Sequence, residues 1–520
     1  MALNFLGQTM PTNPKNLGRQ RRLVVVRRHG TALILALLYL LLPANTWPSE
    51  EPAAPEGVPI APSPPRSPAE QILAPIPSQF GWMQRDVRSN PLLESLLQLT
   101  DRPPQLLMSV SLTEEYSDNF FLSQDDRQEE FRTGLEIGTV YRLEGGRSFL
   151  TLANSLGINY EVRADRVNLP FVNLALNTGY QFPRLSLSLS ESFIRSDDVQ
   201  EASPTGLRGE RRIFFRNSVS PQLRYDLLRT TAMTLGYTNT VVQEQGNSRS
   251  NSDANADGSD NSLSHSVSSG LQHWFTRNVS GSVGYAFATI DSDQTGTRQS
   301  HSGSADLSYL VSARTTASVR SFATFTDRSE GEPDSRFYGL TLGLQRQLTP
   351  YLSAYVAVGP ALLDREGQAK RLIPYWEAAI NGGFPLTRLT TLRVSTSQTI
   401  SNTAGDIDDV GLVLSQSASA TLSHFISRSL IAELFGSYYR TELLESSSVG
   451  STDQGEKFSF WSIGGGMSYA FTQALSLNVT YRYRERDAED TAGRQSDDRF
   501  GDNYRENRVM LTLSAAFRLL

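Results

Sequence analysis

The chain has 520 residues, enough for one large domain or several smaller ones. Only 39% of the residues are hydrophobic and the mean hydropathy is −0.32, which excludes a bundle of membrane-spanning helices. The absence of cysteine excludes disulfides and thiolate chemistry, and a net charge of −6 argues against nucleic acid as a partner.

Residues 1–46 are predicted to be a secretory signal peptide. An apolar run at 31–42, "TALILALLYLLL", follows five arginines and precedes small residues. A helix that crosses a bilayer needs ~20 apolar residues, so this run is short for a membrane span. An uncleaved membrane anchor is the alternative. Removing the segment takes away six Lys or Arg and no acid, so the formal charge falls from −6 to −12.

Residues 47–104 are predicted to be a proline-rich periplasmic linker. Its sequence includes "EPAAPEGVPIAPSPPRSPAE", in which proline prevents a helix or a central strand. We therefore expect a disordered N-terminal arm that leads into a folded domain over 105–520.

From residue 105 onward, segments of about ten to fourteen residues alternate apolar with polar or small residues. The segment "RLSLSLSES" at 184–192 alternates leucine with serine, and "LSLNVTYRYRER" at 475–486 sets apolar residues against hydroxyl, amide and guanidinium groups. A period of two is typical of a β-strand whose two faces meet different surroundings.

The connections between these segments alternate short and long. Short ones include "FPR" at 182–184 and "FTRN" at 275–278, whereas long ones at 244–262 and 485–503 are rich in Asp, Ser and Gly. Short turns at one end and long loops at the other are typical of a transmembrane β-barrel. Closure is expected because an open sheet edge in lipid leaves backbone groups unsatisfied. We predict an all-β, antiparallel up-and-down barrel of about 20 strands, within 18–22.

Aromatic residues near strand ends are predicted to form interfacial belts. The candidates are Tyr438, Tyr439, Trp461, Tyr469 and Phe471. The last segment, 507–520, alternates like a final barrel strand, although its aromatic residue Phe517 stands three residues before the C-terminus.

The first strand and its exit read "SLTEEYSDNFFLSQDD" at 111–126. The residues that form the motif are Glu115, Tyr116, Asp118, Asn119 and Phe120. This stretch resembles the β-barrel porin 2 family and the barrels associated with exosortase and exopolysaccharide loci. The resemblance implies an outer-membrane barrel linked to polysaccharide export or surface-protein sorting, with no catalytic residues to transfer. A strand exit with Asx-turn chemistry is the interpretation we favour over a ligand site.

The alternation also predicts which charged side chains line the lumen. The predicted set is Arg132, Arg142, Arg212, Arg216, Arg224, Arg320, Arg393, Arg482, Arg484, Glu115, Glu136, Glu161, Glu377 and Glu433. One interpretation is charge pairing across neighbouring strands of a wide polar interior. The other is a field that selects solutes, with an arginine excess favouring anions.

Catalysis is not predicted. The histidines are His29, His265, His273, His301 and His424, and His265 lies among serines that the composition supplies anyway. No spacing of His, Asp or Glu indicates a metal site or a carboxylate pair, so neither a metal nor a cofactor is expected.

The sequence therefore predicts an outer-membrane pore, not an enzyme, that passes polar or anionic solutes in connection with exopolysaccharide export. The alternative is a structural anchor or assembly barrel whose loops or N-terminal arm dock a partner. Expected partners are outer-membrane lipid, the barrel-assembly machinery and polysaccharide or export components, without nucleic acid.

Overall fold

A computed structural model describes most of residues 105–519. The described residues are 105–124, 127–163, 166–197, 213–245, 261–293, 296–328, 334–366, 369–387, 389–402, 412–443, 457–489 and 503–519. The predicted signal peptide, linker and disordered arm, all within 1–104, lie outside them. Among the described residues, no helix is long and apolar enough to cross a membrane.

The described residues form twenty strands and the connections between them. The strands are β1 (Gln105–Ser117), β2 (Glu130–Glu144), β3 (Ser148–Glu161), β4 (Arg166–Gln181), β5 (Leu185–Ser196), β6 (Ile213–Leu228), β7 (Thr231–Gln245), β8 (Ser262–Trp274), β9 (Val279–Ser292), β10 (Gly296–Ser312), β11 (Thr315–Arg328), β12 (Ser335–Thr349), β13 (Leu352–Arg365), β14 (Arg371–Pro385), β15 (Thr390–Asn402), β16 (Leu412–Phe425), β17 (Leu430–Leu443), β18 (Lys457–Ala470), β19 (Leu475–Glu489) and β20 (Tyr504–Arg518).

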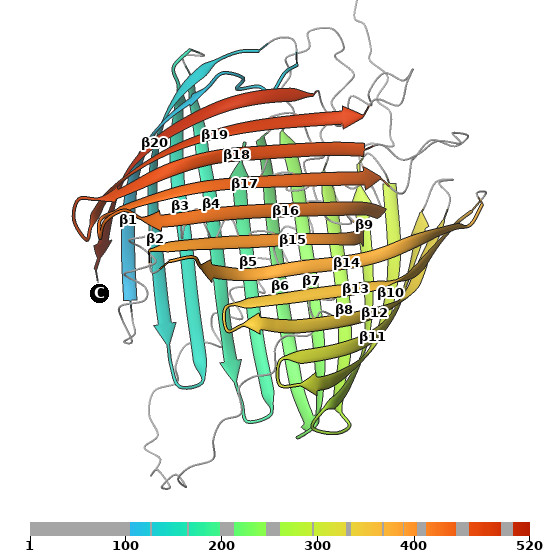
Figure 1. Ribbon diagram of the computed structural model, residues 1–520. Coiled ribbons are helices and arrows are strands. Elements are labelled where there is room, and N and C mark those ends of the chain that lie inside the picture. Colours follow the sequence, from blue (N-terminus) through green and yellow to red (C-terminus); the bar gives the residue numbers. More distant parts are fainter. Residues whose placement is uncertain are drawn as a thin grey trace, which may run out of the picture. The chain divides into compact units, whose positions relative to one another are not determined.

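Each strand pairs antiparallel with the next, and β1 pairs with β20, so the sheet returns on itself (Figure 1). The closing ladder runs from Leu107↔Arg518 to Ser117↔Arg508. The pairing of β1 with β20 leaves no unpaired edge at the terminal strands, which lipid could not satisfy. The predicted all-β antiparallel barrel of about twenty strands is confirmed.

The short turns have a shared hydroxyl chemistry. The hydroxyl of Thr276 accepts the backbone N–H of Val279 at 3.0 Å, and Thr472 accepts that of Leu475 at 3.0 Å. Ser427 does the same for Leu430 at 3.1 Å. A hydroxyl that bonds the backbone a few residues ahead stabilises a tight turn, which explains why these turns join neighbouring strands in so few residues.

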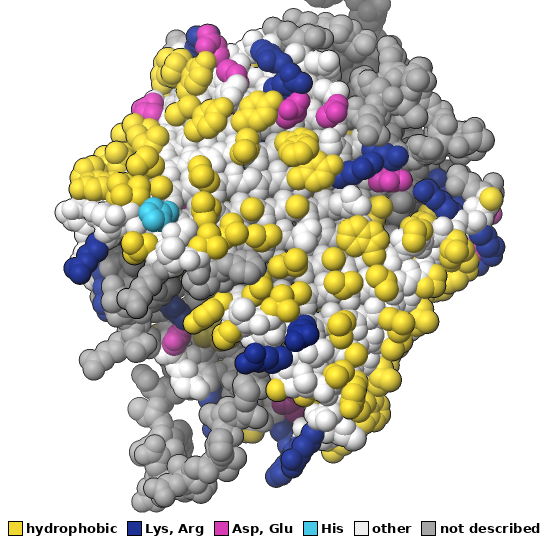
Figure 2. All heavy atoms as spheres, viewed as in Figure 1, with side chains coloured by type: hydrophobic (Ala, Val, Ile, Leu, Met, Phe, Trp, Pro, Cys, Tyr) yellow, Lys and Arg dark blue, Asp and Glu magenta, His cyan; other side chains and the backbone are white. Residues whose placement is uncertain are grey.

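The two faces of the wall differ in chemistry, as the alternation predicts. Large apolar side chains on one face are widely exposed, such as Val283 at 61% and Leu434 at 62%. Figure 2 shows hydrophobic side chains over much of the outside of the barrel, with charged groups mostly towards its ends. This is the arrangement expected where a barrel meets hydrocarbon.

Aromatic pairs lie on the outward face near both ends of the strands. Tyr438 and Trp461 are 4.7 Å apart between ring centroids near the loop end, and Tyr469 and Phe471 are 4.9 Å apart near the turn end. The prediction for Tyr439 is wrong, because its ring packs on buried Phe460 on the inward face. Adjacent residues of a strand point to opposite faces, so Tyr438 and Tyr439 cannot share a belt.

Hydroxyl pairs across neighbouring strands line much of the inward face. Ser111 and Ser514 join β1 to β20 with a 3.0 Å distance between their oxygens. Ser397 and Ser417 join β15 to β16 at 2.7 Å. Because register partners share a face, these pairs form rows that neighbouring strands continue around the wall.

Candidate functional site: the inward face of the barrel wall

The strand β19 places a row of polar side chains on the inward face. Ser476, Asn478 and Thr480 come first from the turn end, and the arginines follow toward the loop end. These are Arg482, Arg484 and Arg486. Each lies two residues from the next, so all three guanidinium groups extend from the same face. The guanidiniums of Arg482 and Arg486 lie over the rings of Phe435 and Phe458, at 5.3 and 4.9 Å from the ring centroids.

Buried ion pairs of Arg484, and of Arg508 on β20, connect the strands that close the barrel. Arg484 Nε lies 2.7 Å from Glu506 Oε2 on β20, and both side chains are at most 1% exposed. Ser117 on β1 donates its hydroxyl to Glu506 Oε1 at 2.7 Å. Arg508 Nη2 donates to Glu115 Oε2 at 2.7 Å. The charges therefore join β19, β20 and β1 in one network, which we call the closure network.

Arg132 on β2 extends this network to β3. Its guanidinium lies 3.5 Å from Glu161 Oε1 and also bonds to Asp197, which follows β5. The same guanidinium lies over the ring of Phe120, 4.6 Å from its centroid. Desolvation of a buried arginine is compensated only where carboxylates surround it, and this arrangement supplies two.

The motif that resembles the porin family lies at this closure. Asp118 accepts hydrogen bonds from the backbone N–H of Asn507 at 2.6 Å and from its side-chain amide at 2.7 Å. Asn119 donates its amide to the carbonyls of Ser123 at 2.7 Å and Arg505 at 2.9 Å. These contacts combine the turn chemistry we favoured with a link from the first strand to the last.

Tyr116 completes the motif at the outer end of β1. Its hydroxyl donates to Glu129 Oε2 at 3.0 Å, and the guanidinium of Arg163 bonds the same carboxylate. The Arg163 guanidinium and then the Tyr116 hydroxyl hold the pKa of Glu129 below its usual value. This group is an exposed tie between the loops that follow β1 and β3.

A second group lies on the inward face of β11 to β14. Arg320 is 5% exposed, has Asp306 and Thr341 as its register partners, and attracts Glu377 electrostatically. Beside it, an apolar cluster interrupts the polar lining. We call it the inner apolar cluster, and its members are Phe322, Phe337, Ala361, Leu363, Ile373 and Tyr375.

The other predicted lining residues are dispersed around the wall. Their register partners put Arg216, Arg224, Arg393, Glu136 and Glu433 on the inward face. Glu433 accepts the Ser423 hydroxyl at 2.8 Å. Two pairs stay within one strand, Arg142 with Glu144 and Arg224 with Asp226. Arg212 lies outside the described residues.

Four charged residues of the closure network were absent from the predicted set. Arg486 continues the alternation of β19 by one step, and Glu506 and Arg508 follow the same rule on β20. Applying the period of two to 504–518 would have found both. Asp197 follows β5, and no periodic signal marks such a residue.

His265, His273, His301 and His424 lie on the outward face, and His29 lies outside the described residues. His265 Nδ1 is 2.9 Å from the Tyr237 hydroxyl, and His301 Nδ1 is 2.8 Å from the Tyr285 hydroxyl. Their register neighbours include Thr289 and Phe325. Within the described ranges, no three His, Asp or Glu side chains gather as a metal-ligand set.

A comparison with protein families bears on this wall. Residues 313–517 match the family described as "Putative beta-barrel porin 2". The matched range runs from just before β11 into β20, so the family resemblance predicted from the sequence is confirmed over the second half of the barrel. The motif at 115–120 lies outside that range. Over these residues the barrel is therefore similar to a family of β-barrel porins.

Solved structures with a similar outline are of low identity. The crystal structure of Pseudomonas aeruginosa OpdL has 11% identity and a TM-score of 0.37, covering 80% of this chain and 99% of that one. OpdK from the same organism has 10% identity and a TM-score of 0.36, covering 80% of this chain and 99% of that one. The ferric enterobactin receptor PfeA of Pseudomonas aeruginosa has 10% identity and a TM-score of 0.45, covering 80% of this chain and 82% of that one. None of these likenesses supports an inference about transport here. None of the curated proteins compared with this chain matches it.

Proposed function

We propose that this protein is an outer-membrane channel for polar and anionic solutes. The observation that carries the proposal is the chemical division of the wall. Apolar side chains cover the outward face, while hydroxyl pairs and guanidinium groups line the inward face of a twenty-stranded barrel. A barrel of 16–18 strands already leaves an aqueous channel, so twenty strands provide room for one.

Inward arginines that are partly exposed support a preference for anions. These include Arg393 on β15 and Arg482 on β19, whereas Arg484 is 1% exposed and lies beside Glu506. Guanidinium groups bind carboxylates and phosphates with two parallel hydrogen bonds. Rings and rows of such charges select ions in pores.

The specific solute that we propose is an acidic polysaccharide, which the channel would export. Hydroxyl rows and guanidinium groups match the hydroxyl and carboxylate groups of such a chain, because both can replace its hydration shell. A wide channel lined in this way suits an extended polymer. The step is passage through a channel, so no covalent chemistry is required.

Reversal potentials of refolded protein in planar bilayers test the anion preference. The variants Arg393→Ser and Arg482→Ser each remove one inward charge, and we expect the anion-to-cation permeability ratio to fall by at least about twofold. Arg505→Ser is the matched control, because Arg505 is 62% exposed and bonds Glu485 near the loop end. A ratio that is unchanged in both inward variants would contradict the proposal.

A structural anchor is the second candidate, and one observation favours it. Inward residues near the loop end, such as Ser117, Glu161 and Glu506, are 0% exposed. A barrel whose lumen is narrow at that end would pass little solute, and it would serve as a membrane anchor whose loops dock a partner. A barrel that is folded, as shown by heat-modifiable gel mobility, yet passes no current would support this candidate.

A further inference from the structure

The ladder between β14 and β15 is much shorter than the others. Its register partners run only from Gly382↔Val394 to Pro385↔Thr391, next to the turn that joins the two strands. By contrast, β14 pairs with β13 along Arg371 to Gly382, and β15 pairs with β16 along its whole length. Among the described residues, the part of β14 from Arg371 to Asn381 therefore has no register partner on β15.

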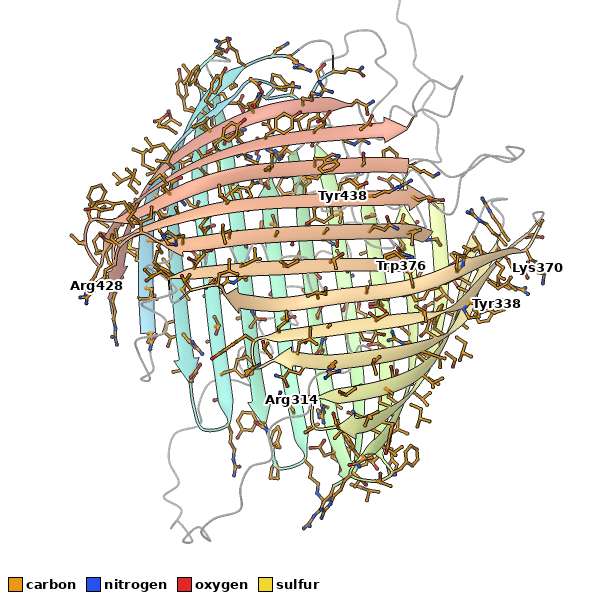
Figure 3. All side chains as sticks on the ribbon, in the orientation of Figure 1. Arg314, Tyr338, Lys370, Trp376, Arg428 and Tyr438 are labelled. Carbon is orange, nitrogen blue, oxygen red and sulfur yellow. The ribbon has the colours of Figure 1, made fainter. Side chains whose placement is uncertain are left out.

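This interruption matters because the wall borders hydrocarbon. Backbone groups that lack a hydrogen-bond partner are strongly unfavourable in the hydrocarbon of a bilayer. The outward side chains of this part of β14 are apolar and exposed, with Leu372 at 68% and Trp376 at 43%. Trp376 is labelled in Figure 3. We call the boundary between β15 and the part of β14 from Arg371 to Asn381 the β14–β15 seam. It combines a lipid-facing position with strand edges that remain available to donate and accept hydrogen bonds.

The inward side of the same stretch is also apolar. Ile373 and Tyr375 lie on β14 within the part that has no partner on β15, and both belong to the inner apolar cluster. Phe337 and Leu363 continue that cluster across β12 and β13. An apolar path therefore leads from the outside of β14 to its inside, with Glu377 as the charged exception near Arg320.

The facing strand β15 has the opposite character on its inward side. Arg393, Ser395 and Ser397 alternate along it. Ser395 and Ser397 bond to serines of β16 at 2.6 and 2.7 Å. One edge of the seam thus suits a hydrocarbon tail and the other suits a polar or anionic group.

We propose that the β14–β15 seam is a lateral opening in which an amphiphile from the membrane lodges, with an acyl tail against the inner apolar cluster and a polar head beside β15. The head group supplies hydrogen bonds to the strand edges, and the tail stays among apolar side chains. This inference rests on the barrel wall and not on anion preference, so the channel can conduct selectively even if the seam is closed.

Cysteine crosslinking tests whether the seam opens, since the natural chain contains no cysteine. If the register of β14 and β15 continued, Ala379 would face Ser397. The double variant Ala379→Cys/Ser397→Cys probes that position. Its matched control is Ser397→Cys/Ser417→Cys, which shares one residue and joins established register partners. We expect the seam pair to oxidise at least about tenfold more slowly, because a disulfide needs a short Cβ separation.

Photocrosslinking in vesicles of phosphatidylcholine and phosphatidylglycerol tests the occupant. Tyr375 is replaced by benzoylphenylalanine, and Tyr439, which is also inward and packed against apolar residues, receives the same change as the control. We expect several-fold more phospholipid adduct at position 375 than at position 439. Locking the seam with the 379/397 disulfide, once forced by strong oxidation, should remove the excess.

Two results would overturn the proposal. One is equal oxidation rates for the seam pair and the control pair, which would show a continuous wall. The other is phospholipid adduct at position 375 no greater than at position 439, which would show that acyl chains do not enter there. Neither result bears on the reversal potentials, so failure here is distinguishable from failure of the channel proposal.

Discussion

Asp118 makes three of the hydrogen bonds that join the end of the first strand to the last strand, two of them through its side chain. Its carboxylate oxygens accept the backbone N–H and the side-chain amide of Asn507, and its own N–H donates to the Asn507 carbonyl at 3.2 Å. A barrel has no other route to closure than the contact between its terminal strands. This one side chain therefore contributes to the stability of the entire wall.

Replacing Asp118 by alanine should destabilise the barrel. Hydrogen bonds to a charged group contribute about 1.5–3 kcal/mol, and the change leaves the Asn507 donors unsatisfied. We expect a loss of about that size in the free energy of unfolding, measured by urea titration of the refolded protein with heat-modifiable mobility as the readout.

Asp291→Ala is the control for that experiment. Asp291 accepts one hydrogen bond, from the Thr297 hydroxyl at 3.1 Å, between β9 and β10, which adjoin in sequence. Its loss should change stability by less than half as much, because it closes no distant contact. Equal effects of both variants would show that Asp118 has no special part in closure.

Glycines allow neighbouring strands and side chains to approach closely on the inward face of β12 and β13. A Cβ added at Gly359 would lie 1.8 Å from the Leu340 carbonyl oxygen, and one at Gly339 would lie 2.6 Å from the Phe322 ring. The first contact is with a backbone atom, which cannot move away by side-chain rotation. The packing of these two strands therefore depends on the missing Cβ at Gly359.

Gly359→Ala should accordingly impair folding, at a cost of about 1–3 kcal/mol typical of overpacking. Gly303→Ala on β10 is the matched control, because a Cβ there has no neighbour within 4 Å. The fraction that refolds into detergent micelles, read as heat-modifiable mobility, should fall for Gly359→Ala alone. Normal refolding of Gly359→Ala would contradict this account, because it would show that a Cβ can be accommodated between the two strands.

The strands and their connections were predictable because each face has only one compatible chemistry. A one-residue shift in "LSLNVTYRYRER" would place arginines in lipid, so the alternation determines the register. The rule has limits at two residues. Tyr439 was predicted from its aromatic character alone, although its odd or even position along β17 determines which face it occupies. Asp197 follows β5, where no alternation applies. The short β14–β15 ladder was not predictable either, because "PYWEAAINGG" alternates as other strands do.

Inward charges in the described part of the barrel differ in their surroundings. The closure network neutralises arginines with buried carboxylates near the loop end, and Arg320 lies with Glu377 on another part of the wall. Arg393 lies apart from both groups, on the inward face of β15. Pairing across strands therefore accounts for much of the charge that the sequence places inside. Inward charges outside these pairs, such as Arg393, are positioned to act on a solute.

The most direct test of the channel proposal is the single-channel conductance of the refolded wild-type protein in a planar lipid bilayer. A water-filled lumen of twenty strands predicts large, steady conductance steps with a reversal potential shifted toward anions in a salt gradient. A barrel that is folded by heat-modifiable mobility and yet gives no steps, or gives steps selective for cations, would contradict it.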